Sequence, residues 1–219
     1  MKSETEVLYD PEPRWPAFVA VLAVGGLYTA LPTQLTVGPR WAFLIIVTAM
    51  LIPAMVMHAR KYHYMDRILG FGITVLVTLA LIGSVIMLID ALPKHTETPT
   101  ELLMSAGSLW LTNILVFTLW YWRLDAGGPH RRDRRRFHTD GAFLFPQMTM
   151  SPVAKREAGE ETFSPNFFDY LYIAFNTSTA FSPTDTPVLA RWAKILGMLQ
   201  SLISLTVLAL LAARAVNIL

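Results

Sequence analysis

Polar side chains interrupt a short apolar stretch near the end of the chain. Residues 167–181 read FFDYLYIAFNTSTAF and run into a Ser/Thr-Asp turn. Asp169, Asn176 and Thr179 recur at helical spacing, so they share one face of a helix. Because polar groups are costly in a bilayer, they usually face a bundle interior or a water-filled cavity. We predict a channel or small-solute permease whose path is lined by this stretch and the last helix, with the candidates Asp169, Asn176, Thr177, Thr179, Thr184, Asp185, Gln200 and Ser204.

The same residues have a second interpretation, which is a dry seam between packed helices. Ser, Thr and Asn side chains often join membrane helices by hydrogen bonds, and Asp185 can cap the last helix. Gln200 and Ser204 lie on one face of that helix, where they can bond to Asn176 or Thr179. The protein is then a non-transporting membrane scaffold or accessory subunit.

The longest loop contains a stretch of six residues, five of which are arginines. A membrane protein usually keeps such a cluster on its cytoplasmic side, where anionic lipids attract it. Surfaces that bind single-stranded nucleic acid combine basic residues with aromatic side chains on which the bases stack. No aromatic residues alternate with these arginines. We therefore predict contact with anionic lipids of the bilayer or with a protein partner, and no nucleic acid, for Arg131, Arg132, Arg134, Arg135 and Arg136.

Other patterns that carry chemistry are absent from the sequence. The chain has no cysteine, which excludes a thiol nucleophile and a cysteine-ligated metal. None of its five histidines forms a His-x-x-x-His pair, the spacing that places two imidazoles on one helix face. Neither a Gly-x-Ser-x-Gly elbow nor a Walker A loop is present. We expect no enzymatic activity, no cofactor and no metal site.

The composition indicates a membrane protein. Of 219 residues, 53% are hydrophobic and only 16% are charged, against about 25% charged in ordinary soluble domains. Five apolar runs have the length that a helix needs to cross about 30 Å of hydrocarbon. The sequence therefore predicts an all-α, polytopic transmembrane helical bundle with helices over 15–31, 41–57, 69–92, 102–122 and 192–216.

The stretch 167–181 is either a short polar spanning helix or a re-entrant half-helix, which is tolerated only where it is buried in protein or lines water. Extended to 166–183, it measures about 27 Å as a helix, so we favour six spans. Fourteen of the eighteen lysines and arginines then lie in cytoplasmic segments, with both termini cytoplasmic. A re-entrant helix from the cytoplasm raises this count to fifteen, so charge does not separate the two topologies. The predicted organisation is a polar cytoplasmic tail (1–14), a four-helix transmembrane region (15–122), a basic cytoplasmic loop (123–165), and a short polar helix, turn and last helix (166–219).

Roughly the last 60 residues resemble a family of uncharacterised bacterial integral membrane proteins, classed as a domain of unknown function. The resemblance is carried by FDYLYIAF at 168–175, TAFSPTD at 179–185 and RAVN at 214–217. It implies a multi-pass protein of the bacterial inner membrane. It leaves open both the activity and whether the protein forms a homo-oligomer. The same region more weakly resembles the pore region of two-span cation channels. It lacks the glycines of their Thr-Val-Gly-Tyr-Gly-Asp filter, whose carbonyls line the pore.

Overall fold

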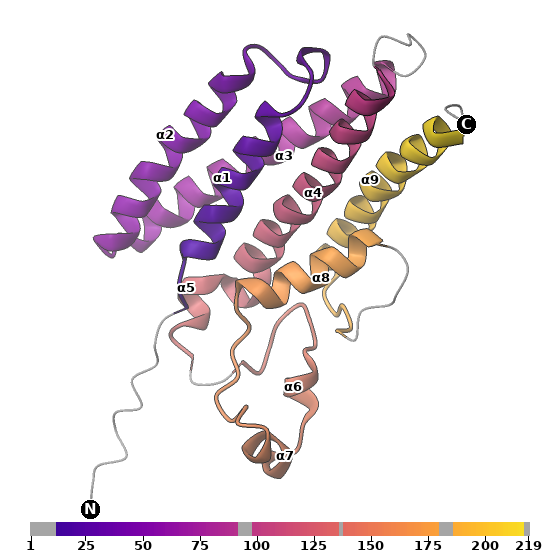
Figure 1. The fold of residues 1–219 in the computed structure, drawn as a ribbon. Helices are drawn as coiled ribbons and strands as arrows, with labels where there is room; N and C mark the ends of the chain where they lie inside the picture. The colour runs from indigo at the N-terminus through magenta and orange to yellow at the C-terminus, as the bar shows by residue number, and fades with distance from the viewer. Residues whose placement is uncertain (1–11, 92–97, 136–137, 180–185, 217–219) are drawn as a thin grey trace, which may run out of the picture.

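The chain folds into a bundle of helices (Figure 1). The computed structural model describes residues 12–91, 98–135, 138–179 and 186–216, whose β-structure is limited to one isolated bridge between Phe143 and Val188. The all-α prediction is confirmed. The helices are α1 (Trp15–Thr29), η1 (Thr33–Leu35), α2 (Arg40–Ala59), α3 (His63–Ala91), α4 (Pro99–Leu124), η3 (Asp125–Gly127), α5 (Pro129–Arg132), α6 (Pro146–Thr149), α7 (Pro152–Glu157), α8 (Phe167–Thr179) and α9 (Arg191–Val216).

Each predicted apolar run is a helix, although the bounds differ by up to six residues. The start of α4 is fixed by a capping box, in which two unpaired backbone N–H groups find side-chain acceptors. The Thr98 N–H donates to Glu101 Oε2 (2.9 Å), and the Glu101 N–H donates to Thr98 Oγ1 (3.3 Å). Pro53 lies inside α2 without ending it.

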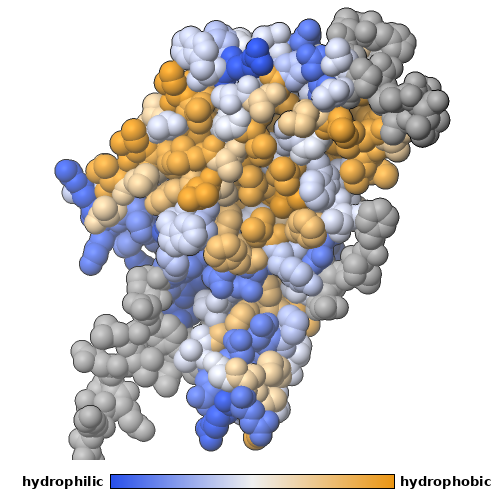
Figure 2. Space-filling model, in the orientation of Figure 1, coloured by the Kyte–Doolittle hydropathy of each residue, from blue (hydrophilic) through white to orange (hydrophobic). Residues whose placement is uncertain are grey.

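Apolar side chains cover the outside of the bundle. On the face shown in Figure 2, hydrophobic residues form a continuous surface over the long helices, and hydrophilic residues gather at the two ends of this surface. Large side chains such as Leu79 (64% exposed) and Ile195 (61% exposed) lie on this surface. Four helical segments, which correspond to α2, α3, α4 with its continuation, and α9, are long and apolar enough to cross a membrane. These features suit a lipid environment.

Hydrogen bonds establish the relative directions of α1, α4 and α9. Tyr121 on α4 pairs with Gln200 on α9, and Asn113 pairs with Ser204, so these helices are antiparallel. Trp122 Nε1 donates to Glu12 Oε1 (2.7 Å), which places the start of α1 beside the end of α4. Consequently α1 begins and α9 ends at opposite ends of the bundle (Figure 1). This arrangement differs from the expectation that both termini face the same side.

The short polar helix α8 does not cross the bundle. Its 13 residues measure about 20 Å, less than the hydrocarbon thickness. Tyr170 lies at the end of α4, where it bonds to Asp125, and Ser178 lies deeper, beside Trp110. Pro187, which follows α8 in the chain, lies back at the end of α4. Its carbonyl accepts a hydrogen bond from the Leu144 N–H (2.9 Å), and the nearby Ala142 N–H bonds to Asp125. The structure therefore does not confirm six spans, and the segments before and after α8 lie at the same end of the bundle.

At one end of the bundle, α1 and α9 begin and α4 ends. We call it the basic end. Arg14, Arg60, Arg67 and Arg123 lie there, whereas Arg40 lies at the opposite end, where its guanidinium donates to the Leu31 carbonyl. The loop between α4 and α8 folds over the basic end, with Phe143 and Phe145 buried against Tyr170.

Reporter fusions test this topology. A fluorescent protein that folds only in the cytoplasm should be bright when fused before Met1 and dark when fused after Leu219, because α1 and α9 begin at the same, positively charged end of the bundle and such ends stay in the cytoplasm. Alkaline phosphatase fused at the same two positions should give the complementary pattern. Cytoplasmic signals from both fusions would instead restore the six-span arrangement.

Candidate functional site

A cavity of about 200 Å³ opens at the basic end, between the start of α3, the end of α4 and α5. The turn behind it needs glycine, because Gly127 and Gly128 have φ values of 84° and 88° and a Cβ on Gly128 would lie 2.7 Å from the Arg123 carbonyl oxygen. The Gly128 N–H donates to the Asp125 carbonyl, so it closes the turn. We call this space the basic cavity, and its lining is Arg14, Phe18, His63, Tyr64, Asp66, Arg67, Phe71, Trp122, Arg123, Gly127, Gly128, Pro129, His130, Arg131 and Arg134.

Among the described residues, Arg123 is the enclosed cation of the cavity that lacks a hydrogen-bond or ion-pair partner, whereas Arg67, Arg131 and Arg134 are exposed. Its guanidinium stacks on the Trp122 ring, 5.2 Å from the centroid, and lies so close to Gly70 that a Cβ there would clash. Its Nε is buried, and within the described residues Arg123 makes neither a hydrogen bond nor an ion pair. Arg14 also lines the cavity and is buried, but it differs from Arg123 because it forms ion pairs with both Glu12 and Asp133.

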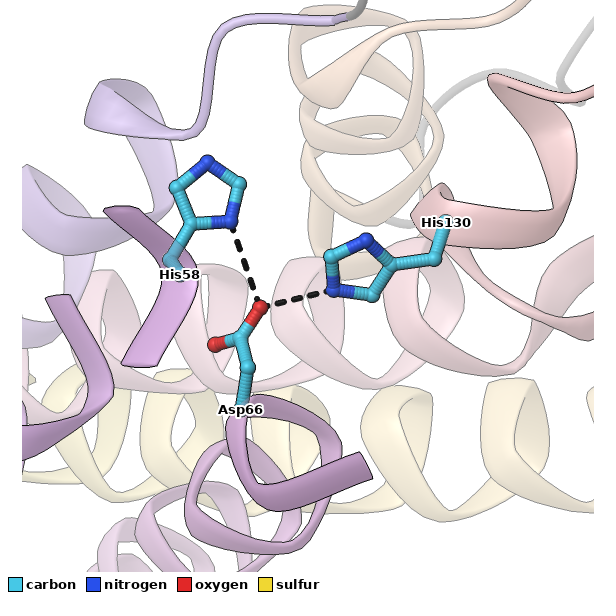
Figure 3. A group of neighbouring side chains, drawn as sticks. All are labelled: His58, Asp66 and His130. Atoms are coloured by element: carbon cyan, nitrogen blue, oxygen red, sulfur yellow. Dashed lines mark hydrogen bonds and ion pairs between the residues drawn. The ribbon is translucent and has the colours of Figure 1, made fainter. Parts of the chain in front are cut away.

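Three potential metal ligands meet beside the cavity (Figure 3). His58 lies in the last turn of α2, Asp66 lies in the first turn of α3, and His130 lies on α5. Asp66 Oδ2 is 3.3 Å from His58 Nδ1 and 2.7 Å from His130 Nε2. This group has no spacing signal in the sequence, because His130 is 64 residues from Asp66.

Asp125 is the centre of a buried polar cluster beneath the cavity. Its Oδ2 accepts a hydrogen bond from Tyr170 Oη (2.6 Å), and its Oδ1 accepts one from the Ala142 N–H. Burial raises the pKa of Tyr170 well above its usual value, so the phenol remains a donor. Burial also lowers the pKa of His138, whose Nε2 is 3.8 Å from Asp125 Oδ2.

Arg132 completes this cluster and corrects one prediction. It is only 2% exposed, and its guanidinium donates to the Trp122 and Asp125 carbonyls (2.8 and 3.1 Å) and to Glu12 Oε2 (3.2 Å). Its lipid-contact assignment is therefore wrong, because the side chain satisfies carbonyls at the end of α4.

The remaining arginines of the predicted lipid-binding set separate. Arg131 and Arg134 are exposed and line the basic cavity, whereas Arg135 pairs with Asp140. Arg136 lies outside the described residues.

Two of the predicted path residues, Gln200 and Ser204, belong to a hydrogen-bonded seam between α4, α8 and α9. Gln200 is fully buried, and its Nε2 donates to the Ala174 carbonyl (2.6 Å) and Ser178 Oγ (2.7 Å). Its Oε1 accepts from Tyr121 Oη (2.7 Å), and Asn113 Nδ2 donates to Ser204 Oγ (2.9 Å).

The partners of Gln200 differ from the predicted Asn176 and Thr179. Thr179 instead donates to the Asn176 carbonyl, and Thr177 to the Ile173 carbonyl, both within α8. Asp169 caps the start of α8 by accepting from the Asn166 N–H (2.7 Å). Thr184 and Asp185 lie outside the described residues.

No protein-family model, curated protein or solved structure matches this chain. The resemblance to uncharacterised bacterial membrane proteins therefore stays a prediction, and the function rests on the site itself.

The Asp125 cluster makes a stability prediction. Replacing Tyr170 by Phe removes one donor from a buried carboxylate, which should lower the free energy of unfolding by about 1–3 kcal/mol. Thermal unfolding of the detergent-solubilised protein, followed by circular dichroism, measures the change. Tyr172→Phe is the matched control, because Tyr172 is on the same helix and 55% exposed. Equal losses in the two variants would argue against the Asp125 contact.

The seam makes an accessibility prediction. Ser204→Cys should not react with a water-soluble maleimide, because Ser204 is 1% exposed and hydrogen-bonded. Ser164→Cys, at an exposed loop position, should react fully and serves as the control. The chain has no other cysteine. Reaction of both variants at similar rates would reveal a hydrated seam and support the permeation path.

Proposed function

We propose that the protein is a multi-pass membrane protein whose basic end faces the cytoplasm and binds the phosphate-bearing headgroup of an anionic lipid in the basic cavity. The observation that carries this proposal is Arg123, a cavity-lining guanidinium with a buried Nε and no partner among the described residues. This is a binding function, as in the predicted non-transporting scaffold, with no chemical step.

The charge of Arg123 requires a counter-charge. A buried ionised group is costly unless it is paired. The neighbouring carboxylate in the cavity is Asp66, which two histidines already engage. An anion that enters the cavity would pair with Arg123, and guanidinium groups form strong, often bidentate hydrogen bonds with phosphate.

The rest of the lining supports the same ligand. Arg67, Arg131 and Arg134 add positive charge around the opening, and Phe18, Phe71 and Trp122 add apolar surface. A phospholipid presents this combination, an anionic phosphate joined to an apolar body. Free inorganic phosphate shares only the first part.

The orientation follows from charge. The basic end carries most of the described arginines, and positively charged loops stay in the cytoplasm. The cytoplasmic leaflet is rich in anionic lipids, which attract such segments. By the family resemblance, we place the protein in the inner membrane of a bacterium.

A solute path along the seam has weaker support. The buried side chains that would line it, Gln200 and Ser204, already bond to neighbouring helices. Interhelical hydrogen bonds of this kind are a common means of membrane-helix association.

Lipid titration tests the headgroup proposal. Native mass spectrometry of detergent-solubilised protein should show one retained phosphatidylglycerol and much weaker retention of phosphatidylcholine. Arg123→Gln should weaken retention about tenfold or more, because a charge-assisted hydrogen bond contributes about 1.5–3 kcal/mol. Competition by millimolar phosphate would indicate that free phosphate is the ligand.

The control variant is Arg60→Gln, which removes the same charge at the same end but outside the cavity lining. Arg131→Gln provides a second cavity variant in case Arg123→Gln alters folding. Equal lipid retention by the wild type and both cavity variants would refute the proposal.

A further inference from the structure

We propose that His58, Asp66 and His130 form a binding site for a divalent transition-metal ion such as Zn²⁺. Their ligand atoms, His58 Nδ1, one Asp66 carboxylate oxygen and His130 Nε2, all lie within 4.8 Å of one another. Three different helices supply them, and the side chains converge on one point (Figure 3). This site does not depend on headgroup binding, because its ligands include none of the arginines.

The separations between the ligand atoms suit coordination. Zinc binds imidazole nitrogen and carboxylate oxygen at about 2.0–2.2 Å, which puts neighbouring ligand atoms of a tetrahedral site about 3.4 Å apart. Asp66 Oδ2 is already 3.3 Å from His58 Nδ1 and 2.7 Å from His130 Nε2. Small side-chain rotations would therefore admit an ion between the three groups.

The donor set selects the kind of metal. Imidazole ligands suit zinc, copper, iron and nickel, whereas magnesium and calcium prefer oxygen donors. Two imidazoles and one carboxylate leave at least one coordination position free, as in metal sites that bind water or substrate. Asp66 and His130 also line the basic cavity, so an ion here would lie at the cavity wall.

The surroundings hold the ligands in place. The His63 ring packs edge-on against the His130 ring, with 4.7 Å between centroids. Asp66 and His130 are half-buried, with side chains 14% and 21% exposed, so an ion can reach them. The competing interpretation is structural, in which Asp66 only ties α2 to α5 by accepting hydrogen bonds from two histidines.

Metal titration separates these interpretations. Purified protein stripped with a chelator, in detergent and phosphate-free buffer, should bind one Zn²⁺ per chain in isothermal titration calorimetry. Co²⁺ in its place should give the visible absorption bands of a low-symmetry site. Asp66→Asn and His130→Gln should each weaken Zn²⁺ binding at least about tenfold. Glu157→Gln, which alters an exposed acidic residue on α7 away from the ligand set, should change the affinity less than about twofold.

Circular dichroism of each variant reports whether it folds, and His58→Gln replaces any ligand variant that does not. A wild-type protein that binds no stoichiometric Zn²⁺ would overturn the proposal. Unchanged binding by the folded ligand variants would also overturn it and leave the structural tie. Since no lipid is present, failure of this experiment does not bear on the headgroup proposal.

Discussion

The buried carboxylate of Asp125 organises the basic end of the protein. It follows the last turn of α4 and accepts hydrogen bonds from Tyr170 on α8 and from the Ala142 backbone in the long loop. Removing an ionised group from water is costly unless such donors compensate it. Three segments that are distant in sequence are therefore held together, and the turn at Gly127 and Gly128 leads into α5, whose His130 reaches Asp66 at the start of α3. Both the basic cavity and the histidine–aspartate group depend on that turn.

The buried polar groups of this protein fall into two kinds. In the seam, Gln200 uses its amide nitrogen and oxygen in hydrogen bonds to α8 and α4, so it acts as a packing element. In the basic cavity, Arg123 has no such partner among the described residues, and Asp66 and His130 face the same space. Unpaired charge is costly in a protein interior, which is why it indicates a ligand more strongly than a satisfied network does.

The sequence predicts the long helices well because run length and apolarity alone are enough to define them in a membrane. It predicts less well how residues from distant segments meet. Arg132 looks like its arginine neighbours in the sequence, yet it is buried because the α4 carbonyls and Glu12 lie beside it. His58, Asp66 and His130 have no recognisable spacing, since packing of three helices brings them together. For α8, composition leaves the topology ambiguous, and the hydrogen bond of Tyr170 to Asp125 anchors its first turn beside the end of α4.

The central claim is that Arg123 pairs with a phosphate group in the basic cavity. An experimental structure of the protein in nanodiscs containing phosphatidylglycerol tests it most directly. The account predicts density for a phosphate whose oxygens lie about 2.7–2.9 Å from the Arg123 guanidinium nitrogens, the range for charge-assisted hydrogen bonds. Ordered lipid elsewhere around the bundle with no phosphate in the cavity, or a carboxylate of the chain paired with Arg123, would contradict it.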